Sequence, residues 1–207
     1  MVTNSVTNTS LKKQKKQYLL LMFLILGGMI LGIIYAFFLK EGDQALVKGT
    51  LDTFFMEIKD GNLHYQSGLI TSVSSNFIYT FLIWVLGISV IGIIFVLFLL
   101  LARGFIVGFA IGSIITRYGF KGLLGAFCYI FPHHLLNILF SVLLSFYAIK
   151  FSIKLINYLF FKKDINFKIA MKKYGEILLI CLGGFFFSSL LEVFVSPFLI
   201  KFFTKII

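Results

Sequence analysis

Charged side chains are scarce in this sequence of 207 residues. Only 13% of the residues are Asp, Glu, Lys or Arg, and the acidic residues number 8. Hydrophobic residues make up 59% of the chain, and the mean hydropathy is +1.01. A water-soluble domain of this size needs more polar side chains than this to cover its surface. The composition therefore excludes a soluble globular domain and indicates that lipid surrounds most of the chain.

Cysteine and proline are also rare, with two residues of each. Cys128 and Cys181 lie far apart in apolar segments and have no C-x-x-C partner, which argues against a disulfide framework or a zinc site. We expect both to act as small apolar side chains. The motifs G-x-S-x-G, H-E-x-x-H and Walker A and a paired-carboxylate arrangement are all missing from the sequence. We therefore expect no enzymatic activity and no metal or other cofactor.

The net charge of +11 does not form one basic domain. Its Lys and Arg residues lie mainly between apolar runs, which is the pattern that orients membrane helices and not one that binds nucleic acid. We therefore expect the lipid bilayer of the inner (plasma) membrane, and no nucleic acid, as the environment of the chain.

Five apolar runs predict an all-α polytopic membrane protein with about five spans. The expected spans are residues 18–39, 77–101, 104–118, 123–149 and 177–200. The third run has 15 residues and rises about 22 Å against a hydrocarbon core of about 30 Å, so we expect it to be short, tilted or re-entrant. Pro132 lies inside the fourth run and predicts a kink there.

The connections between the runs differ in charge, which predicts the topology. Residues 1–17 are expected to be a disordered basic cytoplasmic tail. Residues 40–76 carry three Lys against five Asp and Glu, a net charge of −2, and are expected outside the cytoplasm. Residues 150–173 carry seven Lys and one Asp and are expected inside. The tail 201–207 then lies outside, and the turn with Arg117 and Lys121 is the exception to the charge rule.

Glycine repeats predict where membrane helices pack closely. Gly28 and Gly32 share one face of the first span, and three further glycines recur at four-residue intervals at Gly104, Gly108 and Gly112. Small residues at this spacing allow two helix backbones to approach each other in lipid. A second copy of the chain is a further candidate partner.

The external loop contains an amphipathic pattern. Leu51, Phe54, Phe55 and Ile58 fall at i, i+3, i+4 and i+7, the spacing of one helical face. Two interpretations stay open: this face lies on the bilayer or on the protein's own helices, or it docks a partner.

Few polar side chains fall within the expected spans. They are His133, His134, Asn137, Ser188, Ser189 and Glu192. Ionisable groups at membrane depth are costly and invite a functional hypothesis. Glu192 could join two helices by hydrogen bonds, handle protons or ions, or face the membrane interface. His133 and His134 follow Pro132 and could donate to backbone carbonyls that the proline frees.

Four segments together resemble the stage II sporulation protein M family of endospore-forming bacteria. They are FLIWVLGISVIG at residues 81–92, RGFIVGFAIG at 103–112, FPHHLLNI at 131–138 and LLEVFVSP at 190–197. Wider relatives carry an acidic residue in the proline segment where this chain has Asn137. The resemblance implies a non-enzymatic scaffold of the engulfment machinery at the sporulation septum, which works with stage II sporulation proteins D and P in peptidoglycan remodelling.

Two function classes remain: a scaffold that anchors cell-wall hydrolases, and a small membrane transporter or channel component. The external loop favours the scaffold because an anchor for wall enzymes needs a surface outside the cytoplasm. The sequence shows no inverted repeat of the secondary-transporter kind.

Overall fold

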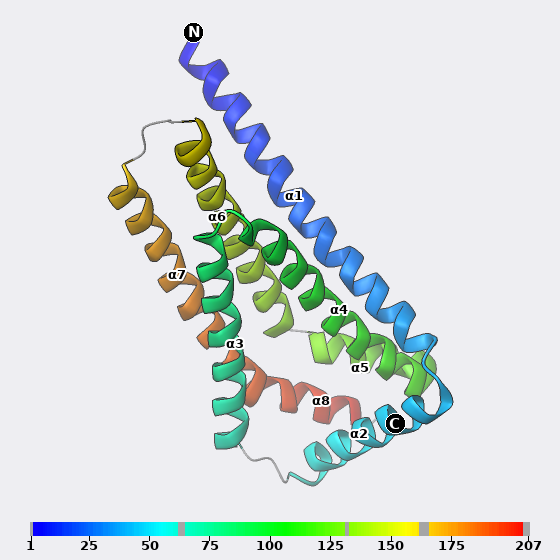
Figure 1. The fold of residues 1–207 in the computed structure, drawn as a ribbon. Helices are drawn as coiled ribbons and strands as arrows, with labels where there is room; N and C mark the ends of the chain where they lie inside the picture. The colour runs from blue at the N-terminus through cyan, green and yellow to red at the C-terminus, as the bar shows by residue number, and fades with distance from the viewer. Residues whose placement is uncertain (1, 62–64, 131–132, 162–165, 205–207) are drawn as a thin grey trace.

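The computed structural model describes residues 2–61, 65–130, 133–161 and 166–204, and every regular element among them is helical (Figure 1). The helices are α1 Val2–Phe37, α2 Glu41–Asp60, α3 Tyr65–Gly87, α4 Gly92–Tyr118, α5 Gly122–Ile130, α6 His133–Phe161, α7 Phe167–Leu190 and α8 Ser196–Thr204. A 3₁₀ turn, Gly119–Lys121, separates α4 from α5, and a π turn, Leu191–Val195, joins α7 to α8.

Five helical segments of the described chain are long and apolar enough to cross a membrane. They are Gln14–Phe37, Tyr65–Gly87, Gly92–Phe127, His133–Phe160 and Phe167–Phe202. The prediction of an all-α polytopic membrane protein with five spans is confirmed.

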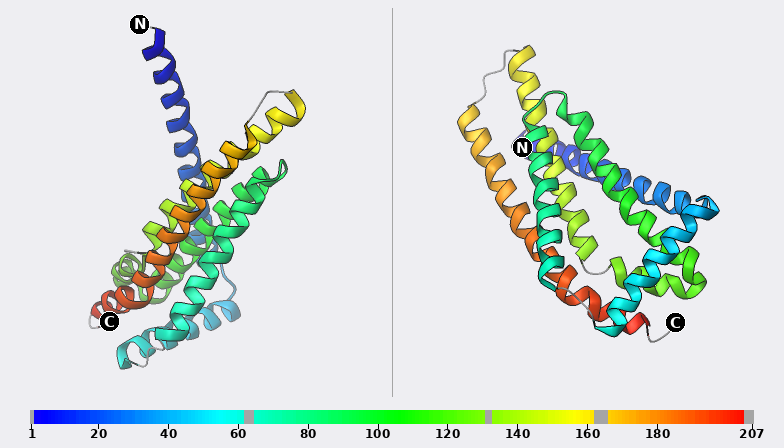
Figure 2. Two further views of the ribbon diagram at one scale, coloured as in Figure 1. Left: turned by 90° about the vertical axis from the view of Figure 1, so that its left-hand side faces the viewer. Right: turned by 60° about the horizontal axis from the view of Figure 1, so that its bottom comes forward.

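The short helices gather at one end of the bundle. Helices α1, α3, α4, α6 and α7 form the length of the molecule, and α2, α5 and α8 lie across the end that Figure 1 draws at the bottom (Figures 1 and 2). Helix α8 contacts both α2 and α5. The start of α1, the α3–α4 turn and the facing ends of α6 and α7 lie toward the opposite end.

Helices α1 and α4 pack backbone to backbone through their glycines. The glycines at this contact are Gly28 and Gly32 on α1 and Gly104, Gly108 and Gly112 on α4. A Cβ added to Gly108 would fall on the carbonyl oxygen of Met29, and one added to Gly28 would fall on that of Leu101. Gly27, one residue off this face, has no atom within 4 Å of such a Cβ. The two glycine repeats predicted from the sequence therefore face each other.

The boundary between the second and third spans differs from the prediction. The chain turns at residues 88–91, inside the run 77–101 that was expected to be one span, and α3 begins at Tyr65 within the expected external loop. Hydropathy does not detect this turn because its residues are mostly apolar. A side chain from another helix provides hydrogen bonds for the backbone carbonyls at this turn. The hydroxyl of Ser152 on α6 donates to the carbonyl of Gly87 at 2.7 Å and to that of Ser89 at 3.1 Å.

The expected short element 104–118 is the second half of a long helix. Helix α4 has 27 residues and rises about 40 Å, so it is neither short nor re-entrant. It stops at Gly119, whose φ of 60° breaks the helical path. The chain then folds back into α5, which contacts α4 and α8.

The predicted span 123–149 is divided between two helices. Helix α5 ends at Ile130 and α6 begins at His133, so the expected kink at Pro132 falls outside the described residues. Only α6 has the length of a span, and it continues to Phe161, well into the segment that was expected to be a basic connection.

The first and the last parts of the described chain both differ from the prediction. Helix α1 begins at Val2, so residues 2–17 of the expected disordered tail are helical. Once a long helix has formed, each added residue gains a hydrogen bond at little further cost. The expected span 177–200 contains the π turn, where the backbone N–H of Ser196 donates to the carbonyl of Leu191.

Candidate functional site

Arg103 lies within the membrane-spanning part of α4, near its middle, and not between two spans as the expected boundaries 77–101 and 104–118 implied. Its Nη2 donates to Oδ1 of Asn76 on α3 at 2.9 Å. The guanidinium carbon lies 4.6 Å from the centre of the Tyr79 ring and 5.7 Å from that of Phe185. A polar acceptor and two aromatic faces therefore hold a cation at a depth where charge is costly.

Polar residues on one face of α3 connect this cation to α7. Asn76 uses its Nδ2 to donate to the hydroxyl of Ser189 at 2.9 Å. One turn earlier, the hydroxyl of Ser72 donates to Oε2 of Glu192 at 2.6 Å. Ser72 and Asn76 are four residues apart and therefore share a face. This face joins α4 to the last span through side-chain hydrogen bonds.

A second set of hydrogen bonds ties the start of α6 to the same place. His133 is 2% exposed, and its Nδ1 lies 2.8 Å from the hydroxyl of Ser196. Ser188 donates to the carbonyl of His133 at 2.9 Å. The imidazole therefore pairs with a side-chain hydroxyl of α8, and the backbone carbonyl of His133 accepts a hydrogen bond from a serine of α7.

The π turn positions Glu192 between the hydrogen bonds made by α3 and those made by the start of α6. Pro197 has no N–H, and its ring would clash with the carbonyl four residues earlier in a regular helix. The wider turn at Leu191–Val195 relieves that clash, and π turns inside helices frequently occur at functional sites. The sequence signature with Glu192 and Pro197 thus corresponds to a local break in the last span.

A cavity of about 470 Å³ opens on this cluster. Its polar lining includes Ser72, Asn76, Arg103, His134, Asn137 and Glu192. Asn137 is 3% exposed, and its Oδ1 finds no hydrogen-bond partner among the described residues. A buried amide oxygen without a partner carries a desolvation cost of about 1–3 kcal/mol, and a bound polar group would relieve that cost.

A neighbouring cavity of about 290 Å³ shares Glu192 with the first one. It is also lined by His133 and Ser196, and by Phe54 and Ile58 of α2. Glu192 therefore borders both cavities, one within the bundle and one that reaches the layer of short helices.

The comparison with protein families matches residues 19–197 to the family model described as stage II sporulation protein M. The chain belongs to the stage II sporulation protein M family. The matched region contains every residue of the polar cluster and ends at Pro197. Comparisons with curated proteins and with solved structures gave no match.

In this member of the stage II sporulation protein M family, the cluster combines a guanidinium, a carboxyl group, two amides, two imidazoles and several hydroxyls. The described residues form no group of three His, Cys, Asp or Glu side chains that could hold a metal ion. The chemistry that this set supports is hydrogen bonding between spans and recognition of a polar group at membrane depth.

Arg103 is the site residue that sequence reasoning missed. It falls between the expected spans 77–101 and 104–118, so the predicted boundaries left it outside both. A signal was available in α3, where residues 65–76 are rich in Ser, Thr and Asn and still belong to a span. A polar face on a membrane helix needs polar partners within the bundle, and Arg103 supplies one of them.

The apolar face of α2 packs against the protein's own helices. Phe55 is 6% and Ile58 is 2% exposed, and both form a core cluster with Ile114 of α4 and Ile200 of α8, against which Leu51 also packs. Phe54 is 38% exposed and borders the smaller cavity. Of the two interpretations of this face, the structure shows the internal one, so the face is not free to dock a partner.

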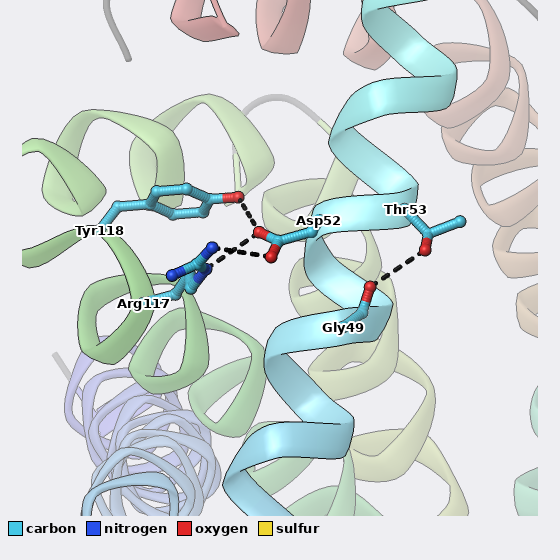
Figure 3. A network of polar contacts seen from close by, with 5 residues as sticks. All are labelled: Gly49, Asp52, Thr53, Arg117 and Tyr118. Carbon is cyan, nitrogen blue, oxygen red and sulfur yellow. Dashed lines mark hydrogen bonds and ion pairs between the residues drawn. The ribbon is translucent and has the colours of Figure 1, made fainter.

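An ion pair also holds α2 to the bundle. Nε and Nη2 of Arg117 donate to the two carboxylate oxygens of Asp52 at 2.9 and 2.7 Å, and the Tyr118 hydroxyl donates to Oδ1 at 3.1 Å (Figure 3). The guanidinium lowers the pKa of Asp52 below its ordinary value of 3.8 through these hydrogen bonds. Arg117, an exception to the charge rule, is therefore paired with an acidic residue of the segment 40–76 that was expected outside the cytoplasm.

Proposed function

We propose that this protein is a non-enzymatic scaffold of the sporulation engulfment machinery, which anchors peptidoglycan hydrolases at the septum. The family match over residues 19–197 carries this proposal, because it makes the chain a sporulation-related membrane protein. The partners that we propose are stage II sporulation proteins D and P. The proposed location is the inner membrane of the septum and the engulfing mother cell, with the N-terminus in the cytoplasm.

The layer of short helices supports a docking role. Helix α2 is fixed to α4 by Asp52 and Arg117 and to α8 by its buried apolar face, so its opposite face is held in a defined position. That outward face carries Leu46, which is 72% exposed, and Met56, which is 64% exposed. By the charge rule this layer lies outside the cytoplasm, on the side of the cell wall. We propose that hydrolases dock on this outward face of α2.

The test is recovery of the two partners with the membrane protein. In sporulating cells, Leu46→Ser with Met56→Ser should leave the protein level unchanged, because neither side chain is buried. Co-purified stage II sporulation proteins D and P should fall at least tenfold, and septal localisation of both should be lost.

Phe55→Ser is the matched control from the inner face of the same helix. It should lower the amount of folded protein, because Phe55 is packed against α4 and α8. Full partner recovery with the double outward variant would reject the docking face. Full recovery after deletion of the whole protein would reject the scaffold.

A second candidate function is a membrane transporter or channel component. The cavity of about 470 Å³ that contains both Arg103 and Glu192 favours it, because charged groups inside a span often line a substrate or ion path. Glu192→Gln separates the two functions. A scaffold should retain partner recovery and sporulation with this variant, whereas a proton-coupled transporter should lose sporulation while the protein level and partner recovery stay normal.

A further inference from the structure

A third cavity, of about 490 Å³, lies at the opposite end of the bundle from α2, α5 and α8. Its polar lining comes from three helices: Gln14 and Gln17 of α1, Lys150 and Lys154 of α6, and Lys173 of α7. Tyr147, Phe151 and Tyr174 are among its apolar walls. We infer that this cavity, named here the lysine pocket, binds the phosphate headgroup of an anionic phospholipid.

The depth of the lysine pocket corresponds to the headgroup level of a bilayer. The span His133–Phe160 has 28 residues and rises about 42 Å, which exceeds a hydrocarbon core of about 30 Å by about 12 Å. Lys154 is six residues before the end of that span and Lys173 is six residues after the start of the next, so each lies about 9 Å from the end of its span. Gln14 is the first residue of the α1 span. The polar lining therefore lies where lipid phosphates meet the acyl chains.

The charge of the lysine pocket favours an anion. Three lysines line it, and its described lining contains no Asp or Glu. Lys150 and Lys154 are four residues apart on α6, and like charges at this spacing destabilise a helix. Nζ of Lys150 lies 5.8 Å from the centre of the ring of Tyr147, which also lines the pocket, and this contact keeps the ammonium group near the pocket wall. A bound phosphate would offset the repulsion among the three lysines.

The apolar walls distinguish a lipid from a free phosphate ion. Phe151 is 4% and Tyr174 is 3% exposed, and their rings stack with centroids 4.7 Å apart. This aromatic wall gives an inorganic ion nothing to contact, but it can pack against the glycerol and the first methylene groups of a phospholipid. Basic pockets between membrane helices are a recurrent mode of headgroup binding.

The experiment measures lipid retention by the purified full chain. The protein is taken from mixed micelles of phosphatidylglycerol and phosphatidylcholine, and bound lipid is measured by native mass spectrometry. The wild type should retain phosphatidylglycerol in at least tenfold excess over phosphatidylcholine, and its melting temperature should rise as phosphatidylglycerol is added. Lys154→Gln with Lys173→Gln should abolish both effects, and both side chains are exposed, so folding should be retained.

The matched control is Lys40→Gln with Lys59→Gln, which removes the same charge from exposed positions beside and within α2. This control should bind like the wild type. If both double variants lost phosphatidylglycerol equally, the effect would be one of net charge and the proposed binding in the pocket would be wrong. The proposal would also be wrong if the wild type showed no preference between the two lipids. Glycerol phosphate at millimolar concentration is the test for a soluble ligand. If it displaced phosphatidylglycerol as effectively as phosphatidylglycerol itself does, the pocket would bind a soluble phosphate and the lipid proposal would be wrong. No partner protein is present, so the result is independent of the scaffold proposal.

Discussion

Arg103 and Glu192 lie within the spans and line the same cavity. Arg103 contacts Asn76 and two aromatic rings, and Glu192 accepts a hydrogen bond from Ser72. Both hydrogen bonds end on α3, which makes this helix the polar partner of the two charged side chains. Glu192 therefore has an intramembrane cation in its surroundings, because α4 brings Arg103 to the same cavity.

Glu192→Leu should destabilise the protein in detergent, because it leaves the buried Ser72 hydroxyl without its acceptor. The expected cost is about 1 kcal/mol, within the range measured for hydrogen bonds between membrane helices. Glu192→Gln keeps an acceptor oxygen and should remain close to the wild type. Unfolding by heat or by sodium dodecyl sulfate measures both, and a Gln variant as unstable as the Leu variant would contradict the hydrogen-bonding role.

The lowered pKa of Asp52 predicts that the contact between α2 and α4 depends on pH. The pKa of Asp52 is lower in the folded protein than its ordinary value of 3.8 because Arg117 donates to the carboxylate. A depressed carboxyl pKa stabilises the contact above pH 3.8, and this stabilisation is lost as the pH falls through the lower folded value. Both side chains are partly exposed, so the effect should be small and should weaken in salt.

The measurement is hydrogen exchange in α2 at neutral pH and below pH 3.8. In the wild type, protection of α2 should fall on acidification. Asp52→Asn is the control at each pH, and it should already show the lower protection at neutral pH with little further change. Equal acid sensitivity of the two proteins would exclude Asp52 as the cause.

At the scale of elements, the contact between α1 and α4 depends on glycines, which have no side chain to keep the two backbones apart. The backbones approach so closely at Gly28, Gly32, Gly104 and Gly108 that a Cβ would overlap a carbonyl oxygen of the facing helix. Lipid supplies no hydrophobic force between helices, so close van der Waals packing has to stabilise the pair.

Gly108→Leu should separate α1 from α4, because the new side chain has to occupy the position of the Met29 carbonyl. We expect a loss of about 1–3 kcal/mol, typical of overpacking. Gly27→Leu is the matched control, since that position has open space around it. Folded yield and melting temperature in detergent report the difference, and equal tolerance at the two positions would refute the glycine contact.

At the scale of the whole molecule, the two ends of the bundle differ in composition. One end carries the acidic helix α2 together with α5 and α8, and the other carries the lysine-rich ends of α6 and α7 (Figure 1). From the positive-inside rule we therefore expect the lysines in the cytoplasm and α2 outside. The α3–α4 turn belongs to the lysine end, although it has no charge of its own.

Single cysteines in a background with Cys128→Ala and Cys181→Ala test this topology. Ser89→Cys and Lys168→Cys should react with a membrane-impermeant maleimide from the cytoplasmic side. Glu57→Cys should react from the opposite side. Labelling of positions 57 and 168 from the same side would overturn the topology. If the cysteine at position 89 reacted only after solubilisation, residues 88–91 would not form a turn at the membrane surface, and that part of the topology would be wrong.

The number of spans and several contacts follow from local sequence properties. Apolar runs of sufficient length have to be helical in lipid, because each backbone N–H and C=O needs a partner within its own segment. The four-residue glycine spacing marks faces that allow close approach, and these faces meet between α1 and α4. The amphipathic segment with Phe55 and Ile58 is helical for the same local reason.

By itself, then, the sequence determined that the chain is a five-span helical membrane protein, which of its faces are small or amphipathic, and that Glu192 lies within the last span. Only the tertiary structure decided where the second span ends, which cation shares a cavity with Glu192, and what covers the inner face of α2. The reason is that each of these depends on a partner distant in the chain. Ser152 completes an apolar turn 63 residues away, and Asn76 accepts from Arg103 across 27 residues.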